Sequence, residues 1–417
     1  MKVEFDVLII GGGMVGASLA CALSPLKLKT GIIERCTTDA EQQPSFDDRS
    51  IAMAYGTKKI FRAIGIWDNL VDVISPIRKI HISERGNFGA TRLDCKQLAV
   101  DALGYVVESR DMGRVLRARL QDSKQIEVIS PADVKDVIIL DDHAELVIQV
   151  GEQTRILTST LVIAADGSQS FTRGQLNIPV KTLEYGQTAL ISNVSMSSDH
   201  HNIAYERFTP TGPLALLPMQ PADIQGKACP RCSLVWTLRD DQIDEVMALA
   251  DDEFLSRLQE TFGRRLGEFI HVGSRHAYPL RLIRASEHVQ SRIALIGNAA
   301  HTLHPVAGQG YNLGIRDVAV LADVIASALR AGRDIGDIQV LGEYAKWRQR
   351  DHNNVITFTD SLIRIFTNPL FPVKVARGLA LTALDFFPVV KNGMARRTMG
   401  LSGYLPRLAR GLPVSVK

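Results

Sequence analysis

Short, continuous runs of aliphatic and β-branched residues recur along the chain, and each run stops at a glycine-rich or acidic segment. Val3–Ile10 (VEFDVLII), the run ending at Glu34 (LKTGIIE), Leu161–Ala165 and the RIALIG run before Asn298 share this form. Runs of this length and composition predict buried strands. The first and last of them continue through glycines into helical patterns, ASLACAL and YNLGIRDVAVLADVIASAL, so they predict an α/β unit.

A different pattern occupies the middle of the chain, from about residue 181 to residue 275. TALISNVSM, NIAYERFT, GPLALLPM and RCSLVWTL alternate apolar and polar positions and are separated by turn residues, which predicts an antiparallel sheet. The segment Ile80–Leu93 (IHISERGNFGATRL) is expected to add strands to it. The last part of the chain follows helical patterns.

Composition and charge limit the classes of protein to consider. A chain of 417 residues predicts two or three domains, and 46% hydrophobic with 22% charged residues is the balance of a globular protein. The net charge of +3 argues against a general nucleic-acid binder, which needs a basic excess. Five scattered cysteines are typical of a reducing compartment. Because we find no leader pattern and no apolar run of about 18 residues, we expect a cytoplasmic protein without a membrane span.

Positive charge is concentrated in the last part of the chain. From Leu362 to Lys417, nine Lys or Arg residues stand against one acid, Asp385, and leave the first 361 residues at −5. Apolar stretches such as LALTALDFFPVV lie between these cations. A segment of this kind suits contact with an anionic membrane surface or a partner, and it suits equally a helical cap with a solvated basic face. The two interpretations are compatible.

The clearest short motif follows the first predicted strand. GGGMVG places Gly11, Gly13 and Gly16 at G-x-G-x-x-G spacing, where glycines permit a tight turn and the approach of a pyrophosphate to a helix N-terminus. Glu34 ends the second strand 18 residues after Gly16, and an acid there accepts hydrogen bonds from a ribose 2′-hydroxyl. Together these features predict an adenine dinucleotide without a 2′-phosphate, either FAD or NAD.

Two later segments help to distinguish these dinucleotides. The strand Leu161–Ala165 ends in Asp166-Gly167, within DGSQSFTR, and the stretch GNAAHTLHPVAGQGYNLG again delivers a strand end to a helix. Three strand ends that direct glycines and polar groups to one crevice fit an extended dinucleotide better than a nicotinamide site.

The three nucleotide motifs resemble those of the FAD-dependent aromatic hydroxylases related to para-hydroxybenzoate hydroxylase. They are GGGMVG, DGSQSFTR and GNAAHTLHPVAGQGYN, in this order and spacing. Further segments are similar to the ubiquinone-biosynthesis hydroxylases, most closely those that act on 2-octaprenyl-6-methoxyphenol: FDDRSIAM, SERGNFG, YVVESRDMGRVL, ERFTPTGPLALLPM, CSLVW and RTMG. The resemblance covers essentially the whole chain. It implies FAD as cofactor, O2 as co-substrate, and NAD(P)H or a separate reductase as electron donor.

The resemblance also implies an architecture of the α/β class. We expect a Rossmann-like FAD-binding domain from residues 1–75, 100–180 and 276–350. An inserted antiparallel β-sheet substrate domain, residues 76–99 and 181–275, would roof the flavin and form a substrate pocket. Residues 351–417 would form a helical, basic C-terminal region.

By position, the resemblance assigns individual residues to FAD. Gly11, Gly13 and Gly16 would hold the pyrophosphate, and Glu34 the adenosine ribose. Arg49 would lie on the flavin side of a loop that lets the isoalloxazine move. The other residues implied are Arg110 or Arg114 on a helix that reaches FAD, the pair Asp166 and Gly167, and, along the ribityl chain and flavin ring, Gly297, Asn298, Pro305, Gly308, Gly310 and Asn312.

One of these positions departs from the wider family, which has Gly-Asp where this chain has Gly297-Asn298. The Asp of the family accepts a hydrogen bond from the ribityl chain. Asn keeps an acceptor oxygen without the charge, so we expect FAD binding to survive. The methoxyphenol-hydroxylating subgroup tends to have Asn here, which makes it a mark of that subgroup.

The reaction implied by the resemblance is the hydroxylation of a phenol ring. A C4a-hydroperoxide of FAD would deliver oxygen to 2-polyprenyl-6-methoxyphenol and give the 1,4-benzoquinol. Implied partners are the polyprenyl phenol and other ubiquinone-biosynthesis proteins in a complex. From its charge, the C-terminal region is expected to contact the inner face of the cytoplasmic membrane. Two alternatives stay open: a hydroxylase for another ring position, and a non-catalytic flavoprotein scaffold. An NAD-dependent dehydrogenase would leave the later motifs unexplained, and a flavin halogenase would need the W-x-W-x-I-P signature, which is absent.

The remaining polar candidates have weaker support. His301 and His304 lie three apart, but no carboxylate or thiol stands at a useful spacing, and zinc needs at least three protein ligands, so no metal is predicted. Cys229 and Cys232 form one CxxC, for which packing is the main interpretation and a redox disulfide the alternative. No catalytic base can be identified from the sequence. His301, His304 and Tyr185 are candidates, each with a structural alternative.

Overall fold

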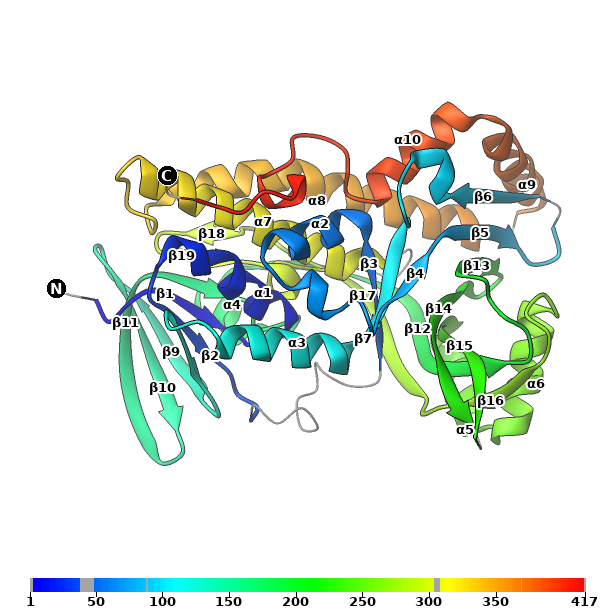
Figure 1. Cartoon of the computed structure of the whole chain (residues 1–417), viewed down its shortest axis with the longest axis horizontal. Coiled ribbons are helices and arrows are strands. Elements are labelled where there is room, and N and C mark those ends of the chain that lie inside the picture. The colour runs from blue at the N-terminus through cyan, green and yellow to red at the C-terminus, as the bar shows by residue number, and fades with distance from the viewer. Residues whose placement is uncertain are drawn as a thin grey trace.

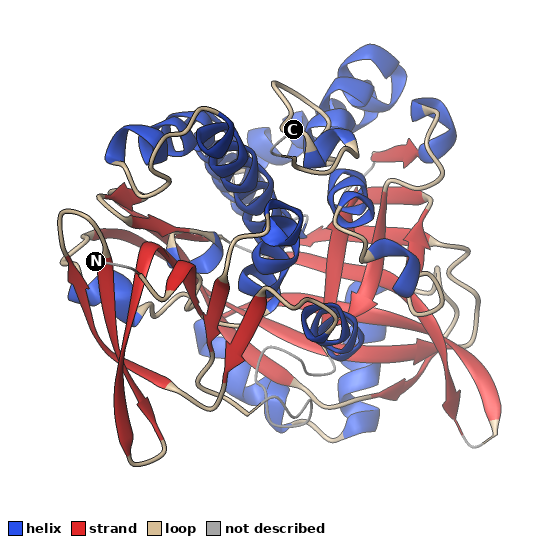
Figure 2. Cartoon of the chain, turned by 60° about the vertical axis from the view of Figure 1, so that its left-hand side comes forward, coloured by secondary structure: helices blue, strands red, loops and turns tan. Residues whose placement is uncertain are grey.

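The computed structural model describes residues 3–37, 49–87, 89–224, 226–303, 308–368 and 370–415. Two large sheets lie beside each other along the long axis of the molecule, and long helices cross them (Figure 1). A turned view shows helices against both sheets (Figure 2). Short 3-10 helices occur at Ser24–Leu26, Trp67–Asn69, Cys95–Leu98, Asp240–Gln242, Gly297–Ala299 and Leu408–Arg410.

The first sheet contains the strands predicted from the buried apolar runs. Its parallel strands are, in spatial order, β19 (Ile293–Leu295), β11 (Gln153–Ala164), β1 (Phe5–Ile10), β2 (Thr30–Ile33) and β8 (Ile126–Ile129). Antiparallel strands complete it: β18 (Val289–Gln290) at one edge, and the hairpin of β9 (Asp133–Ile139) and β10 (Ala144–Val150), which pairs with the first half of β11.

Two helices pack closely over this sheet. They are α1 (Met14–Leu23) and α7 (Gln309–Arg330), and their buried faces share one apolar core with the sheet. A Cβ added to Gly314 of α7 would lie 3.1 Å from a methyl group of Val15 on α1. The close approach of the two helices therefore depends on the missing side chain of Gly314.

The second sheet has nine strands and contains the predicted antiparallel region. Along its main path the strands run β20 (His301–Thr302), β17 (His276–Ala285), β12 (Val180–Met196), β15 (Lys227–Arg239), β14 (Gly212–Ile224), β13 (Ile203–Thr209), β5 (Lys79–Glu84) and β6 (Ala90–Asp94), with β16 (Phe269–Val272) paired to β12. All pairs are antiparallel except β5–β13. Strands β17 and β20 fall in the range 276–350 that was expected for the other domain.

Helices α5 (Ile243–Ala248) and α6 (Asp251–Phe262) cover one face of the second sheet. Phe254, Leu258 and Phe262 of α6 pack on a core that includes Leu190 and Trp236. The opposite face of this sheet is therefore free of α5 and α6 and faces other parts of the molecule.

A three-stranded sheet lies between the two large ones. Its strands are β3 (Ser50–Ala54), β7 (Gly104–Glu108) and β4 (Ser75–Ile77), followed in the chain by α2 (Tyr55–Ala63) after β3 and α3 (Ser109–Gln121) after β7. The short helix α4 (Phe171–Gln175) follows β11. The backbone of β3 contacts the start of α7, so this small sheet brings the second half of the molecule to the end of the first sheet.

The C-terminal region is helical, as predicted. It contains α8 (Ile338–Thr367), α9 (Phe371–Phe386) and α10 (Pro388–Thr398). Helix α8 begins beside α7 and ends beside α9, so one helix crosses the boundary expected near residue 350. Among the described helices, none is both long and apolar enough to cross a bilayer. The predicted fold class, an α/β unit with an inserted sheet and a helical C-terminal region, is confirmed.

Candidate cofactor and substrate site

The parallel strands of the first sheet end in one row. The register pairs Ile33 with Ile10, Ile10 with Ala164, and Ala164 with Leu295. The residues that follow these strand ends are Glu34, Gly11, Ala165-Asp166 and Ile296-Gly297. Because carboxyl ends of parallel strands share an edge, all three sequence motifs converge there, as predicted.

The glycines of the first motif have two different environments. A Cβ on Gly11 would lie 2.6 Å from the carbonyl oxygen of Ala165, and a Cβ on Gly16 would lie 2.0 Å from that of Gly11. These two glycines are required by packing. Gly13 precedes α1 with φ of −63°, which any residue adopts, and no side chain caps the helix. Its lack of a side chain instead leaves the first N–H groups of α1 accessible to an anion.

Glu34 is held rigidly beside this turn. One carboxylate oxygen accepts from the N–H of Gly12 at 2.7 Å, and the other accepts from the N–H of Cys36 at 2.9 Å. Each oxygen retains a lone pair. The carboxylate can therefore accept the hydroxyl groups of a ribose without moving.

Asp166 presents an unsatisfied acceptor at the same edge. Its Oδ2 accepts from the N–H of Thr172 at 3.0 Å, whereas its Oδ1 is buried and has no hydrogen-bond partner among the described residues. Gly167 follows with φ of +85° and open space where a side chain would lie. A buried acceptor without a partner is costly, so this oxygen fits a hydroxyl donor on a bound dinucleotide.

Arg173 joins the second motif to the third. Its guanidinium donates to the carbonyl oxygens of Ser168 and Ala299, both at 2.9 Å. Asn298, in the turn Gly297–Ala299, is exposed. Its amide therefore remains accessible to a ligand at this edge.

The start of α7 is fixed against the small sheet. Gly308 precedes the helix with φ of +60°, and a Cβ there would lie 2.9 Å from the Cβ of Ala52. The amide of Asn312 accepts from the Ala54 N–H and the Thr57 hydroxyl at 2.7 Å, and donates to the carbonyl oxygens of Ala52 and Gly308. Its side chain thus organises the turn. Gly310 has open space at its Cβ position, whereas Pro305 lies outside the described residues.

The predicted arginines are less uniformly placed. The Arg49 guanidinium lies 5.1 Å from the ring centroid of Tyr278, at the start of β3 and next to the second sheet. Arg110 and Arg114 are exposed in the first half of α3, and Arg114 forms an ion pair with Asp111 at 2.9 Å. Arg49 is therefore the predicted arginine that lies between the two large sheets.

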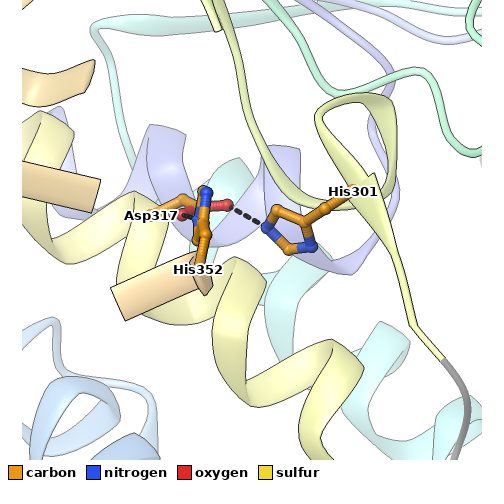
Figure 3. A group of neighbouring side chains, drawn as sticks. All are labelled: His301, Asp317 and His352. Carbon is orange, nitrogen blue, oxygen red and sulfur yellow. Dashed lines mark hydrogen bonds and ion pairs between the residues drawn. The ribbon is translucent and has the colours of Figure 1, made fainter. Parts of the chain in front are cut away.

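A buried polar network lies behind the third motif (Figure 3). One oxygen of Asp317 accepts from His301 Nε2 at 2.8 Å and the Gly297 N–H at 3.0 Å. The other accepts from Arg348 Nε at 2.6 Å and His352 Nε2 at 2.8 Å. Burial opposes ionisation of Asp317, but Arg348 and the two imidazoles hold its pKa well below the ordinary value.

The network has metal-type ligands in His301, Asp317 and His352, which the spacing of His301 and His304 did not reveal. All four acceptor positions of the Asp317 carboxylate are occupied, and Arg348 already supplies a balancing cation. A metal ion would have to displace that guanidinium. The arrangement instead ties β20, α7 and α8 to the turn at Gly297.

An apolar cavity of about 340 Å³ adjoins the start of α7. One wall is the face of the second sheet opposite α6, and the other walls come from β3, Gly308 to Asn312, and the C-terminal helices. The C-terminal helices contribute Phe358, Leu362, Phe366, Leu381, Leu384, Lys391, Met394, Ala395, Thr398 and Met399. The sequence patterns predicted helices in this region but not their position against the cavity.

The candidate bases and the CxxC lie away from this cavity. Tyr185 and His301 are not among its lining residues, and His304 lies outside the described part of the chain. Burial and the neighbouring Asp360 raise the pKa of Tyr185 to about 12, which makes it a poor base. Cys229 and Cys232 are buried, free thiols on β15, and burial raises the pKa of Cys232, so packing is their role in this structure.

A dinucleotide cradle at a carboxyl edge, with an apolar cavity beside the start of α7, is the arrangement expected of a dinucleotide-dependent enzyme such as a flavoenzyme. The model of a family described as FAD binding domain matches residues 4–359. The chain belongs to this family and, within it, to the ubiquinone-biosynthesis hydroxylases, which makes it an FAD-dependent aromatic monooxygenase.

Two named relatives agree with this assignment, and a solved structure agrees with the fold. The chain is 37% identical over 413 residues to ubiquinone hydroxylase UbiL of Rhodospirillum rubrum. The matched residues make up 98% of this chain and 93% of the relative. It is 30% identical over 400 residues to 3-demethoxyubiquinol 3-hydroxylase of Escherichia coli, covering 95% and 98%. The crystal structure of p-nitrophenol 4-monooxygenase PnpA from Pseudomonas putida DLL-E4 matches with a TM-score of 0.79 and 18% identity, over 97% of this chain and 99% of that chain. At that identity, the match concerns the fold.

Proposed function

We propose that this hydroxylase acts on a 2-polyprenyl-6-methoxyphenol and converts its ring to the 1,4-benzoquinol. The apolar cavity that adjoins the start of α7 carries the proposal, because an isoprenoid-substituted ring needs an apolar enclosure beside the cofactor. Its volume of about 340 Å³ lies within the range of roughly 300–1,000 Å³ that is typical of small-molecule pockets. The relatives that bear ubiquinone names support the substrate class.

We assign FAD to the cradle at the carboxyl edge of the first sheet. The N-terminus of α1 at Gly13 would hold the pyrophosphate, Glu34 the ribose, and Asp166 Oδ1 a hydroxyl group of the cofactor. Asn298 would accept from the ribityl chain, and the backbone around Gly308 and Gly310 would contact the flavin ring. When bound and reduced by NAD(P)H or a reductase, FAD supplies the activation of O2. The protein binds the ring, orients it, and excludes water from the cavity.

A hydroxylase for another position of the same pathway is the second candidate. The Escherichia coli relative is named as a 3-hydroxylase of demethoxyubiquinol, and this chain is 30% identical to it. The fold does not set the ring position, because the position depends on how the cavity orients the substrate.

The substrate also needs a route from the membrane. We propose that α9 and α10 contact the inner face of the cytoplasmic membrane. The α9–α10 surface consists of apolar side chains that are more than half exposed: Leu379, Phe386, Phe387, Val389 and Val390. The same two helices line the cavity with Leu381, Leu384 and Met394. A polyprenyl chain could thus pass from lipid into the cavity along two helices that border both.

Product analysis tests the ring position. Purified protein loaded with FAD would receive NADH or a reductase as electron donor. Its substrate would be either 2-prenyl-6-methoxyphenol or a short-chain demethoxyubiquinol. The products would be identified by mass spectrometry and NMR. We expect hydroxylation of the methoxyphenol para to its hydroxyl. Exclusive hydroxylation of the demethoxyubiquinol would support the second candidate, and accumulation of the matching intermediate in cells that lack the gene would give an independent answer.

A further inference from the structure

One carboxyl group lies in the apolar wall of the cavity. Strand pairing places a row of residues across the second sheet, from β6 through β5, β13, β14 and β15 to β12. The row is Thr91, Ile82, Glu206, Ala215, Val235 and Ile191, and all six line the cavity. Side chains along one such row point to the same face. Glu206 therefore lies near the middle of a wall whose other members are apolar or a threonine.

Within the described part of the chain, no protein group balances the charge of Glu206. Among the described residues, no hydrogen bond or ion pair reaches its carboxyl group. The other ionisable lining residues are Tyr205 and Lys391, and the Lys391 ammonium bonds to Asp385 at 3.2 Å. The nearby Arg377 of α9 is paired with Glu84 of β5. The ammonium of Lys391 and the guanidinium of Arg377 are thus each paired with another acid.

The isolation of Glu206 has a measurable consequence. Burial alone raises its pKa to about 7, from an ordinary value of 4.5. Glu206 is half-buried, and a carboxyl group without a partner in an apolar wall destabilises the fold, whereas alanine or leucine would continue the wall. A polar group in this position is explained if the ligand of the cavity supplies the missing partner.

We propose that Glu206 binds the phenolic hydroxyl of the substrate and accepts its proton during hydroxylation, an assignment that rests on the proposed function. The substrate hydroxyl would otherwise be buried without a partner in an apolar cavity. As the O–H bond breaks, its proton passes to a Glu206 oxygen, and the electron pair stays on the phenolic oxygen and enriches the ring. The ring carbon gains one oxygen atom of O2, which reduced FAD would activate, and the other oxygen atom leaves as water. The proton of that ring carbon passes to water, and Glu206 returns the stored proton when the product hydroxyl re-forms.

This placement also gives the cavity a means of selection. A methyl ether of the same ring has the same apolar surface but cannot donate a hydrogen bond to Glu206. A site built to bond a substrate hydroxyl discriminates strongly against an analogue that lacks it. The preference for a free phenol is therefore the property that distinguishes a binding role from a structural one.

Equilibrium dialysis of oxidised, FAD-loaded protein measures this preference without turnover. The probes are 2-methoxy-6-prenylphenol and its methyl ether, 1,2-dimethoxy-3-prenylbenzene. At pH 8 we expect the parent to bind the phenol more tightly by roughly 10- to 100-fold, the gain from a hydrogen bond to a charged group. Glu206→Ala should bind both probes alike, and Glu206→Gln should show an intermediate preference.

Two further measurements complete the test. Glu127→Gln, which changes an exposed glutamate on β8, should retain the preference of the parent. The kcat/KM of the parent for the phenol should rise with pH through about 7, the pKa of Glu206, and this rise should disappear in Glu206→Gln.

The outcomes separate this assignment from the proposed function. If Glu206→Ala keeps the phenol preference and the pH profile of the parent, Glu206 is not the recognition group, although the cavity still binds the substrate. If the parent binds neither probe, the proposed substrate class is wrong, and the assignment of Glu206 fails with it.

Discussion

Gly13 is the residue at which the backbone and the proposed ligand make different demands. Its φ of −63° would accept any side chain, yet valine there would occupy the space assigned to the pyrophosphate. We expect Gly13→Val to fold and to purify with little FAD, and Glu34→Ala to bind FAD more weakly than the parent but better than Gly13→Val. Flavin absorbance per protein measures both.

A valine at an open helical glycine is the matched control. Gly342 on α8 has no neighbouring atom within 4 Å of an added Cβ, so Gly342→Val should retain its FAD. Folded Gly13→Val with a full complement of FAD would contradict the assignment of the first motif.

Asn298 offers a second residue-level test. Its exposed amide would lose one hydrogen bond to the ribityl chain in Asn298→Ala, which weakens FAD by roughly 0.5–1.5 kcal/mol. Asn298→Asp should bind FAD at least as well as the parent. Flavin titration decides, with the exposed Asn69→Ala as control. Tighter binding by Asn298→Ala would exclude the proposed contact.

Glu206 makes stability depend on pH in a defined direction. Its pKa is about 7 in the folded protein and near 4.5 when unfolded, so the folded state binds more protons between these values. The contribution of Glu206 to the free energy of unfolding therefore falls as pH rises from about 4.5 to 7. Glu206→Gln should be more stable than the parent at pH 8 by roughly 2–3 kcal/mol, and about equal to it at pH 4.5.

Thermal unfolding of the two proteins at several pH values measures this difference. Glu127→Gln, with an exposed carboxyl group, should track the parent throughout. A constant difference between Glu206→Gln and the parent would mean that Glu206 is not buried as an acid.

At the scale of elements, the positive charge of the C-terminal region divides into separate groups. Arg377 and Lys391 are buried against Glu84 and Asp385, so they present no charge to a membrane. Arg396 and Arg397 are exposed at the end of α10, near the α9–α10 surface. The turn Leu408–Arg410 packs instead on α2 and α7.

The proposed membrane contact of α9 and α10 can be tested with variants chosen from these groups. The measurement is the fraction of protein that pellets with vesicles rich in phosphatidylglycerol at low salt. Two double variants are compared with the parent: Phe386→Ser with Phe387→Ser, and Arg396→Gln with Arg397→Gln. We expect each to pellet less than the parent while retaining FAD. Each exposed arginine near an anionic surface contributes about 1 kcal/mol. Arg407→Gln with Arg410→Gln is the control and should pellet normally. Equal pelleting of all variants would favour delivery of the substrate by a partner protein.

At the scale of the whole molecule, the sequence was most informative where the determinants are local. The turn from Gly11 to Gly16 and the spacing to Glu34 lie within one βαβ unit, so strand, turn and helix could be predicted together. The antiparallel region was predictable because alternation has a period of two. Both depend on neighbours in the chain.

The remaining features depend on pairings between distant segments. Glu206 faces the cavity because β13 pairs with β5 and β14 in one register, and periodicity alone does not tell which face of a sheet adjoins a cavity. Asp317 meets Arg348 and His301 only through the packing of α7, α8 and β20. For the same reason, the role of α9 and α10 in closing the cavity was not visible in their amphipathic patterns.

The parallel pair of β5 and β13 has a consequence for how the chain is made. More than 100 residues separate the two strands, and β13 is synthesised long after β5 has left the ribosome. Until then, β5 lacks its inner neighbour, and Ile80 and Ile82, which later line the cavity, have no sheet to join. Non-local pairings of this kind slow folding and expose strand edges to aggregation. We therefore expect the nascent chain to be most open to aggregation while β5 still lacks β13.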